Sequence, residues 1–181
     1  MKDVRIFRPS ECRMFIDAIP KVAYRTTFKA LLYSGMRYIE MQRFQKHPEW
    51  FDGDFIHLPI MAIRKKKRKQ LERWVRLNPT GKEIISNFLH NKDVKPLPDY
   101  KTWRDNLKRW AKRASIDPTK LGPKTTRKTW ESWLVFYYEE KLVTILKSMG
   151  HTRTTAIDHY VNLPFTDQDR RDMEAFVGGW I

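Results

Sequence analysis

The sequence predicts a mainly α-helical domain with one small antiparallel β-hairpin, an α+β fold. Three observations predict it. Apolar residues recur at helical spacing along most of the chain, one short stretch holds two strand-like segments, and no internal repeat or Gly/Ser-rich linker divides the sequence. With 181 residues, of which 41% are hydrophobic, the chain is long enough for one ordinary core. We therefore expect residues 1–181 to form a single domain.

The amino-terminal part of the chain predicts three helices. Residues 9–19 form the first, with Ser10 as its expected N-cap. Residues 22–34 form the second, and Gly35 is expected to end it just before a third helix starts near Tyr38. The apolar side chains that these first two helices are expected to bury are Met14, Phe15, Ala18, Ile19, Phe28, Leu31 and Leu32.

Residues 50–79 have a different character, which predicts the hairpin. Residues 55–60 are typical of a strand, and residues 73–77 are its expected partner. The connector between them is densely cationic, so we expect a hairpin with a basic tip. The cations of this run are Arg64, Lys65, Lys66, Lys67, Arg68 and Lys69.

The second half of the chain is again predicted to be helical. The expected helices span residues 81–89, 102–114, 125–140, 142–149 and 154–161. Thr80 is the expected cap of the first of them. Tryptophans in the stretches 103–110 and 130–133 recur at helical spacing, which favours a place in the core over a platform for stacking bases.

A last helix is expected in the tail, residues 165–181. Thr166 and Asp169 resemble a capping box at its start. Its apolar face would consist of Phe165, Met173, Phe176 and Trp180. This face could pack on its own domain or dock on a neighbouring protomer, and the spacing fits both arrangements.

Charge is the strongest compositional feature. The chain has 36 Lys and Arg against 21 Asp and Glu, a formal net charge of +15, and its pI is near 10.0. Such a field favours a polyanionic partner, because each neutralised phosphate releases condensed counterions. Anionic lipid is a weaker alternative, since no basic amphipathic helix stands apart from the folded pattern. Nucleic acid is the partner that the charge leads us to expect.

Other classes of protein are disfavoured by composition. No apolar run approaches the roughly 20 residues that span a bilayer, so no membrane association is expected. The amino terminus lacks the apolar segment of a secretory signal, and the single cysteine, Cys12, cannot form an internal disulfide. These features predict a cytoplasmic protein.

Several polar residues are unremarkable alone but form an ordered series. Arg37 follows the glycine turn and Glu40 lies three residues further, and a Lys-x-x-Arg pair opens the 125–140 helix. A Gly-His pair follows the 142–149 helix, and a tyrosine stands nine residues beyond the histidine. In isolation these would be a surface charge, a solvated helix face, a helix cap and a core tyrosine. In chain order the series is Arg37, Glu40, the cations of 64–69, Lys124, Arg127, His151 and Tyr160.

This ordered set resembles the tyrosine recombinase and integrase family over about residues 9–160. The family pattern is Gly-x-Arg-x-x-Glu, a lysine on a β-hairpin, His-x-x-Arg, and Leu-Gly-His followed nine positions later by a nucleophilic tyrosine. The resemblance implies the tyrosine recombinase catalytic-domain fold, in a DNA-integrating enzyme of a virus or mobile element. It also implies site-specific cleavage and rejoining of DNA through a 3′-phosphotyrosine, without metal, cofactor or ATP. Self-association into a dimer or tetramer on DNA is a further implication.

The resemblance assigns a role to each residue of the series. Two guanidinium groups can hold the nonbridging oxygens of a phosphodiester as negative charge builds up there, and Arg37 and Arg127 are expected to do so. Tyr160 would attack the phosphorus. His151 would hydrogen-bond the phosphate or help to move the tyrosine proton, and Glu40 would orient the site.

The lysine assignments are less direct. In the family a hairpin lysine gives a proton to the departing 5′-oxygen, and here Lys65, Lys66 and Lys67 all remain candidates. Lys124 stands where the family has the histidine of His-x-x-Arg, as in some archaeal viral integrases. A lysine can still donate to a phosphate oxygen, but at neutral pH it is a poor general base. The remaining cations, Arg64, Arg68, Lys69 and Lys128, are expected to contact DNA phosphates.

Two other functions stay open on the sequence alone. A DNA-binding module that kept the fold without catalysis would not require all four of Arg37, Arg127, His151 and Tyr160. A type IB topoisomerase-like enzyme would share the phosphotyrosine chemistry, but the Gly-His-to-Tyr spacing favours the integrase interpretation. Family members also carry an amino-terminal core-binding domain, which we expect to be absent from these 181 residues.

Overall fold

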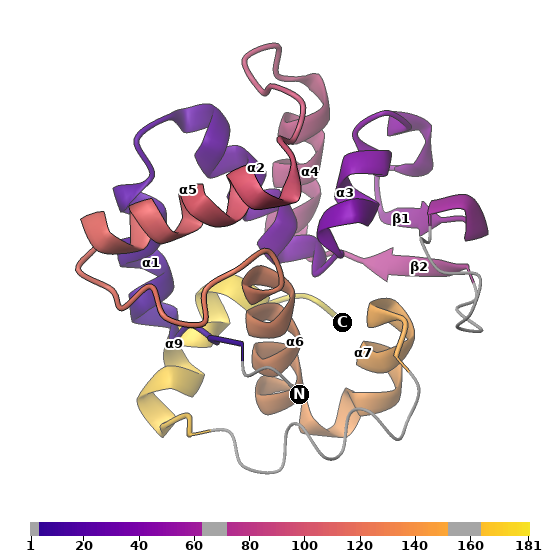
Figure 1. Cartoon of the computed structure of the whole chain (residues 1–181). Helices are drawn as coiled ribbons and strands as arrows, with labels where there is room; N and C mark the ends of the chain where they lie inside the picture. The colour runs from indigo at the N-terminus through magenta and orange to yellow at the C-terminus, as the bar shows by residue number, and fades with distance from the viewer. Residues whose placement is uncertain (1–3, 63–71, 152–163) are drawn as a thin grey trace.

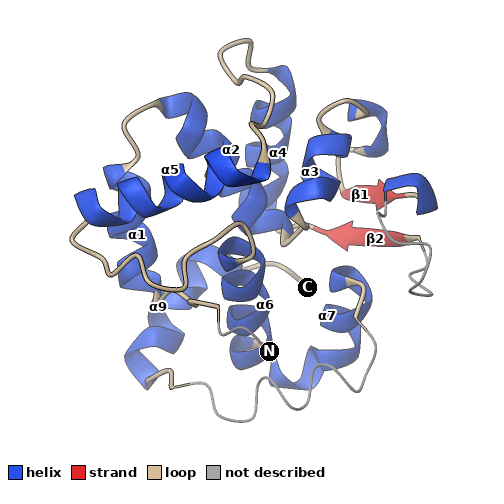
Figure 2. Ribbon diagram, viewed as in Figure 1, coloured by secondary structure: helices blue, strands red, loops and turns tan. Residues whose placement is uncertain are grey.

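A computed structural model describes residues 4–62, 72–151 and 164–181 (Figure 1). The predicted fold class is confirmed, because the described chain is mainly helical with one two-stranded antiparallel sheet (Figure 2). The elements in chain order are α1 (Pro9–Ala18), α2 (Val22–Ser34), α3 (Tyr38–Phe44), the 3-10 turn η1 (Pro48–Trp50), β1 (Phe55–Leu58), η2 (Ile60–Ala62), β2 (Arg73–Arg76), α4 (Pro79–His90), α5 (Tyr100–Arg113), α6 (Thr125–Tyr137), η3 (Glu139–Lys141), α7 (Leu142–Met149) and α9 (Asp167–Val177).

Helix α6 lies at the centre of the packing. It contacts α2, α7 and α9, while α4 and α5 pack on α2 and α1 (Figure 1). The predicted core position of the tryptophans is confirmed, since Trp103, Trp130 and Trp133 are at most 1% exposed. Burial of such large aromatic side chains supplies much of the driving force for folding. The first turn of α6 is therefore held in the interior, close to the end of α2.

The sheet is a short hairpin that packs on α7. Ile56 pairs with Val75 and His57 with Trp74 in antiparallel register. The predicted first strand was two residues too long, because Pro59 has no N–H to continue the ladder and the chain turns into η2. The basic run 64–69, predicted as the hairpin tip, lies outside the described residues.

Two predicted helix caps are wrong. Helix α1 begins at Pro9, and the backbone N–H of Arg8 before it donates to Glu11, whereas Ser10 lies inside the helix. Asn78, not Thr80, caps α4, because its side chain accepts the N–H of Gly81. In both helices a proline occupies the first helical position, where its fixed φ favours helix and its missing N–H costs nothing. The cap is therefore displaced to the residue before the proline.

Other boundaries and core positions also need correction. Helix α5 starts at Tyr100 because Asp99 accepts the backbone N–H groups of Lys101 and Thr102, and α6 ends at Tyr137 before the turn η3. In α1 the buried face includes Cys12 and Ile16, while Met14, predicted to be buried, is 53% exposed. The predicted helix 154–161 lies outside the described residues.

The tail helix α9 folds back on its own chain and packs on α1 and α6. Its predicted capping box is confirmed, since Thr166 and Asp169 exchange hydrogen bonds. Met173 and Trp180 are almost completely buried, and the Trp180 indole N–H donates to the carbonyl of Arg76. None of the helices in the described part of the chain is long and apolar enough to cross a bilayer.

The Asn78 side chain joins α4 to this tail, which makes it a test of the fold. Its oxygen caps α4, and its amide donates to the carbonyls of Phe176 and Gly178. Replacing Asn78 with Ala removes the cap and leaves these two carbonyls without their donor. We therefore expect a loss of about 2–3 kcal/mol in the free energy of unfolding. Thr80→Ala, at the exposed residue two positions on, should change it by less than about 0.5 kcal/mol. Urea denaturation measures both, and equal effects of the two variants would contradict the assignment.

Candidate active site

The end of α2 places the first arginine. Gly35 ends the helix at φ +59°, and a Cβ built there would lie 2.8 Å from Met149 Sδ and 2.8 Å from Trp130 Cδ1. Only glycine combines this conformation with such close packing. The turn brings Arg37 to the start of α3, and it leaves the Gly35 carbonyl free to accept a hydrogen bond from Arg127 Nη1 at 2.7 Å.

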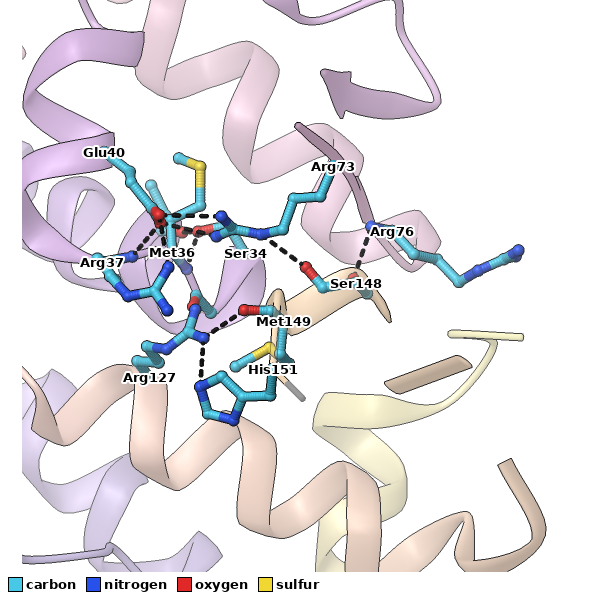
Figure 3. A network of polar contacts seen from close by, with 12 residues as sticks. Ser34, Met36, Arg37, Glu40, Arg73, Arg76, Arg127, Ser148, Met149 and His151 are labelled. Atoms are coloured by element: carbon cyan, nitrogen blue, oxygen red, sulfur yellow. Dashed lines mark hydrogen bonds and ion pairs between the residues drawn. The ribbon is translucent and has the colours of Figure 1, made fainter. Parts of the chain in front are cut away.

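Glu40 is the buried carboxylate of the site, with 1% of its surface exposed. It accepts hydrogen bonds from the backbone N–H of Arg37 at 2.8 Å and from Arg37 Nη1 at 2.7 Å (Figure 3). Arg73 Nη1 and Nη2 bind its two oxygens at 2.9 and 2.7 Å. Burial opposes ionisation, but the hydrogen bonds and charge of Arg73, with Arg37 and Arg127 adding to them, lower the pKa of Glu40 to about 2. Glu40 is therefore ionised at neutral pH.

Arg73 joins the hairpin to the end of α7. Besides its pair with Glu40, its Nε donates to the carbonyl of Ser148 at 3.0 Å, and the Ser148 hydroxyl accepts the N–H of Arg76 at 3.0 Å. Gly150 ends α7 at φ +67°, and a Cβ there would lie 2.8 Å from Arg73 Cδ. These contacts fix the position of the residue that follows, His151.

Arg127, in the first turn of α6, is only 6% exposed. Its guanidinium donates to the carbonyls of Gly35 and Met149, and its Nη2 lies 2.8 Å from Nε2 of His151 (Figure 3). Burial lowers the pKa of Arg127 to about 9, with the nearby charges of Arg37 and Arg73 acting in the same direction. It still carries its charge at neutral pH, as arginine does generally in proteins.

His151 lies between Arg127 and a second buried carboxylate, Glu131. His151 Nδ1 is 2.6 Å from Glu131 Oε1, and Lys128 Nζ is 3.4 Å from Glu131 Oε2. Glu131 is completely buried, which opposes ionisation, but His151, Arg127 and Lys128 together lower the pKa of Glu131 to about 2. For His151, burial is the largest influence and lowers its pKa, so the imidazole is neutral at neutral pH.

The cluster carries more positive than negative charge. Four cations (Arg37, Arg73, Arg127 and Lys128) stand against two carboxylates, Glu40 and Glu131. Arg37 is the most accessible of the three arginines, with 28% of its side chain exposed against 5% for Arg73. Fixed donors of this kind in a desolvated setting stabilise negative charge that develops on an anion. Arg37 is therefore accessible to an anionic group from solvent, whereas Arg127 lies behind it with its Nη atoms bonded to the protein.

Comparisons with known proteins identify the fold that holds this cluster. No protein-family model and no curated protein matches the sequence. Solved structures do match over nearly the whole chain. The Tn1549 transposon integrase in complex with transposon right-end DNA is 18% identical with a TM-score of 0.66, over 98% of this chain and 68% of its own. The XerA recombinase is 18% identical with a TM-score of 0.65, over 96% of this chain and 65% of its own.

The chain has the tyrosine recombinase catalytic-domain fold. A second Tn1549 integrase structure, in complex with circular intermediate DNA, agrees at 17% identity and a TM-score of 0.67, over 97% of this chain. The chain spans about two thirds of the length of these structures. The fold expected from the ordered motif residues is thus confirmed.

Within the recombinase fold, the predicted site residues divide into three groups. Arg37, Glu40, Arg127 and His151 come together in one cluster, and Lys128 joins it through Glu131. Lys124 is exposed at the N-cap position of α6, one turn before Arg127, and its carbonyl accepts the backbone N–H of Lys128 at 2.9 Å. The residues that lie outside the described ranges are Arg64, Lys65, Lys66, Lys67, Arg68, Lys69 and Tyr160.

Sequence reasoning missed Arg73 and Glu131, the two buried charges that support the motif residues. Both had a detectable pattern. Arg73 is two residues before Val75 in a strand, so the alternation of side chains places it on the same buried face. Glu131 is four residues after Arg127 and three before Leu134, so helical spacing places it on the buried face of α6. Among the residues that the structure describes, no group of three potential metal ligands occurs.

The bond between Arg73 and Glu40 predicts a pH-dependent loss of stability. Arg73→Met leaves a buried carboxylate without its bidentate partner, which should cost about 3 kcal/mol at pH 7. The pKa of Glu40 is depressed in the folded protein, so its stabilising contribution is present above its ordinary pKa of 4.5 and is lost as the pH falls towards about 2. The difference between wild type and variant should therefore shrink between pH 7 and pH 3.

Urea denaturation over this pH range measures the effect. Arg104→Met is the matched control, because 42% of the Arg104 side chain is exposed and it forms an ion pair with its neighbour Asp105. We expect this control to change the free energy of unfolding by less than about 0.5 kcal/mol at every pH. A loss in Arg73→Met that stays constant with pH would show that Glu40 is not the group left unpaired.

Proposed function

We propose that this chain is the catalytic domain of a site-specific DNA recombinase or integrase, which cuts and rejoins strands through a 3′-phosphotyrosine at Tyr160. The observation that carries the proposal is the convergence of Arg37, Arg127 and His151 on one positively charged cluster within the recombinase fold. These residues come from α3, α6 and the end of α7, which are far apart in the sequence. A fold that brings them together supplies the donors that phosphoryl transfer requires.

The chemistry follows from the donors. Negative charge on the nonbridging oxygens of the scissile phosphate is held by Arg37 and Arg127, and the tyrosine oxygen attacks phosphorus. The phosphotyrosine keeps the energy of the broken bond, so that rejoining needs no ATP, and two fixed guanidinium groups take the place of a metal ion. A hairpin lysine, from Lys65, Lys66 and Lys67, gives the departing 5′-oxygen its proton. Lys124 acts as a further phosphate donor.

Double-stranded DNA is the proposed substrate. The net charge of +15 supports it, and so do the Tn1549 integrase structures, which were determined with DNA bound. Phosphate contacts from the basic run 64–69 and from Lys128 would position the duplex. Assembly of two or four protomers on DNA, in the cytoplasm of a host cell, belongs to the same proposal.

Burial of the cluster favours an enzyme over a module that only binds DNA. Arg73 and Arg127 are each 6% exposed, and burying a charge is costly unless it is paired. Binding to a phosphate backbone needs only exposed cations, which this chain has in excess. Arg37 and Arg73 are held by the carboxylate of Glu40, and Arg127 is held by two backbone carbonyls. This fixed geometry benefits catalysis far more than affinity.

Covalent trapping tests the nucleophile. Nicked duplexes with a randomised central sequence lose a short fragment on cleavage, which prevents rejoining and leaves the protein linked to DNA. Wild type should give a DNA-linked band on a denaturing gel, and Tyr160→Phe should give none, because phenylalanine has no oxygen to attack phosphorus. Sequencing the trapped DNA then identifies the target.

Tyr100→Phe is the control for this experiment, since Tyr100 is half exposed on α5 and lies outside the cluster. It should trap DNA as wild type does. A band that persists in Tyr160→Phe would assign the nucleophile to another residue. DNA binding without any band from the randomised pool would favour the binding module, and relaxation of supercoils without sequence preference would favour a topoisomerase-like enzyme.

Salt dependence tests the phosphate contacts. If six or more phosphates are neutralised, raising salt from about 50 to about 200 mM should weaken DNA binding by roughly 10³-fold, because each released counterion gains less entropy in more concentrated salt. Removing one phosphate contact with Lys69→Gln should lower the slope of log affinity against log salt by about 1. Fluorescence anisotropy with a labelled duplex measures both slopes. A DNA affinity that does not change with salt would refute the proposal that basic residues of this chain neutralise DNA phosphates.

A further inference from the structure

Glu131 is a buried carboxylate that the proposed mechanism has not used. It lies on α6 one turn after Arg127, and none of its surface is exposed. Its Oε1 is 2.6 Å from Nδ1 of His151, and its Oε2 is 3.4 Å from Nζ of Lys128. A carboxylate in such a position is costly to bury, and its neighbours keep it ionised with a pKa of about 2. Its contact with His151 has a consequence for the proton on the imidazole.

The two neighbours of His151 select one tautomer. Arg127 can only donate hydrogen bonds, and its Nη2 lies 2.8 Å from Nε2 of His151, so Nε2 carries a lone pair. The ionised Glu131 can only accept, so its position 2.6 Å from Nδ1 favours the neutral imidazole with the proton on that nitrogen. Both contacts come from α6, and the end of α7 holds the histidine between them.

We propose that Glu131 is a positioning residue that holds His151 with its proton on Nδ1 and the lone pair of Nε2 facing the phosphate-binding cluster, as the proton acceptor. The inference rests on the proposed function. His151 is then the base for the tyrosine proton. This chain would otherwise lack one, because a lysine, Lys124, stands at the position of the family's histidine. Glu131 does not touch the reacting atoms and acts only through His151.

The proton transfers of the cleavage step balance. Nε2 takes the hydroxyl proton of Tyr160 as the tyrosine oxygen forms its bond to phosphorus and the bond from phosphorus to the 5′-oxygen breaks. The 5′-oxygen takes a proton from the ammonium group of Lys65, Lys66 or Lys67 and leaves as a hydroxyl. The imidazolium lies against the Glu131 carboxylate, which stabilises its charge. Arg127 loses its acceptor on Nε2, and that N–H becomes available to the phosphate.

The surroundings of His151 decide the expected pH dependence. The charged groups in the cluster are Arg127, Lys128 and Glu131 on α6, Arg73 on β2, and Arg37 with Glu40 at the start of α3. Burial lowers the pKa of His151 most, Glu131 raises it, and Arg127 and Lys128 lower it further. Removing the Glu131 charge therefore lowers the pKa of His151 still more. Since the base must be neutral, the acid limb of the rate profile should move to lower pH.

The kinetic test compares wild type, Glu131→Gln and Glu139→Gln in single-turnover covalent trapping across pH. Glu139→Gln is the matched control, because the same change is made at an exposed glutamate paired with Arg170. We expect Glu131→Gln to cleave about 100-fold more slowly on its plateau, with its acid limb at lower pH and DNA affinity unchanged. In a His151→Gln background, Glu131→Gln should cost nothing further. A slower rate with an unmoved acid limb, or full additivity with His151→Gln, would overturn the inference.

A measurement on DNA-free wild type separates this inference from the proposed function. The ¹⁵N shifts of the imidazole, assigned through the signals lost in His151→Gln, should identify the Nδ1-protonated tautomer at neutral pH. The Nε2-protonated tautomer would overturn the inference even if cleavage is observed. If wild type traps no DNA at all, the proposed function fails and the proton-acceptor role fails with it, while the tautomer still decides whether Glu131 positions His151. If wild type traps DNA and Glu131→Gln matches it at every pH, the inference alone fails.

Discussion

The rest of the site depends on the buried carboxylate of Glu40. Three guanidinium groups, those of Arg37, Arg73 and Arg127, lie in one cluster and repel each other. Burial is the main cause of the lowered pKa of Arg127, and the charges of Arg37 and Arg73 lower it further. Glu40 offsets this repulsion by accepting from Arg37 and from both Nη atoms of Arg73. It also accepts the N–H that opens α3, so the same carboxylate fixes the start of a helix and the position of the hairpin. Charge balance and backbone geometry are thus set by one side chain.

Helical spacing was sufficient to predict where most helices lie, because a buried stripe every three or four residues reflects packing that the whole fold shares. Helix ends were less predictable because they depend on competition within a few residues. Ser10 and Thr80 have suitable side chains, yet each lies beside a proline that takes the first helical position. The cap then falls on the residue before the proline. In α1 this residue is Arg8, which has no side-chain oxygen, and the carboxylate of Glu11 accepts its backbone N–H.

The site was predictable where chemistry depends on order along the chain and less so where it depends on burial. Arg37, Glu40, Arg127 and His151 form a series that spacing reveals, and the fold brings them together. Arg73 and Glu131 belong to no such series, and a charged residue in sequence is ordinarily a solvated one. Only the folded structure shows that Arg73 binds Glu40 and that Glu131 lies between Lys128 and His151.

The two arginines of the proposed phosphate clamp differ in what holds them. Arg127 donates to carbonyls at the ends of α2 and α7, so it links two parts of the fold and is nearly inaccessible to solvent. Arg37 is held at one edge by Glu40 and is partly exposed. An incoming phosphate would therefore meet Arg37 first. It could reach Arg127 only through the N–H groups of Arg127 that do not already donate to the protein. Because both guanidinium groups are already held by protein partners, much of the cost of orienting the donors is met during folding rather than during the reaction.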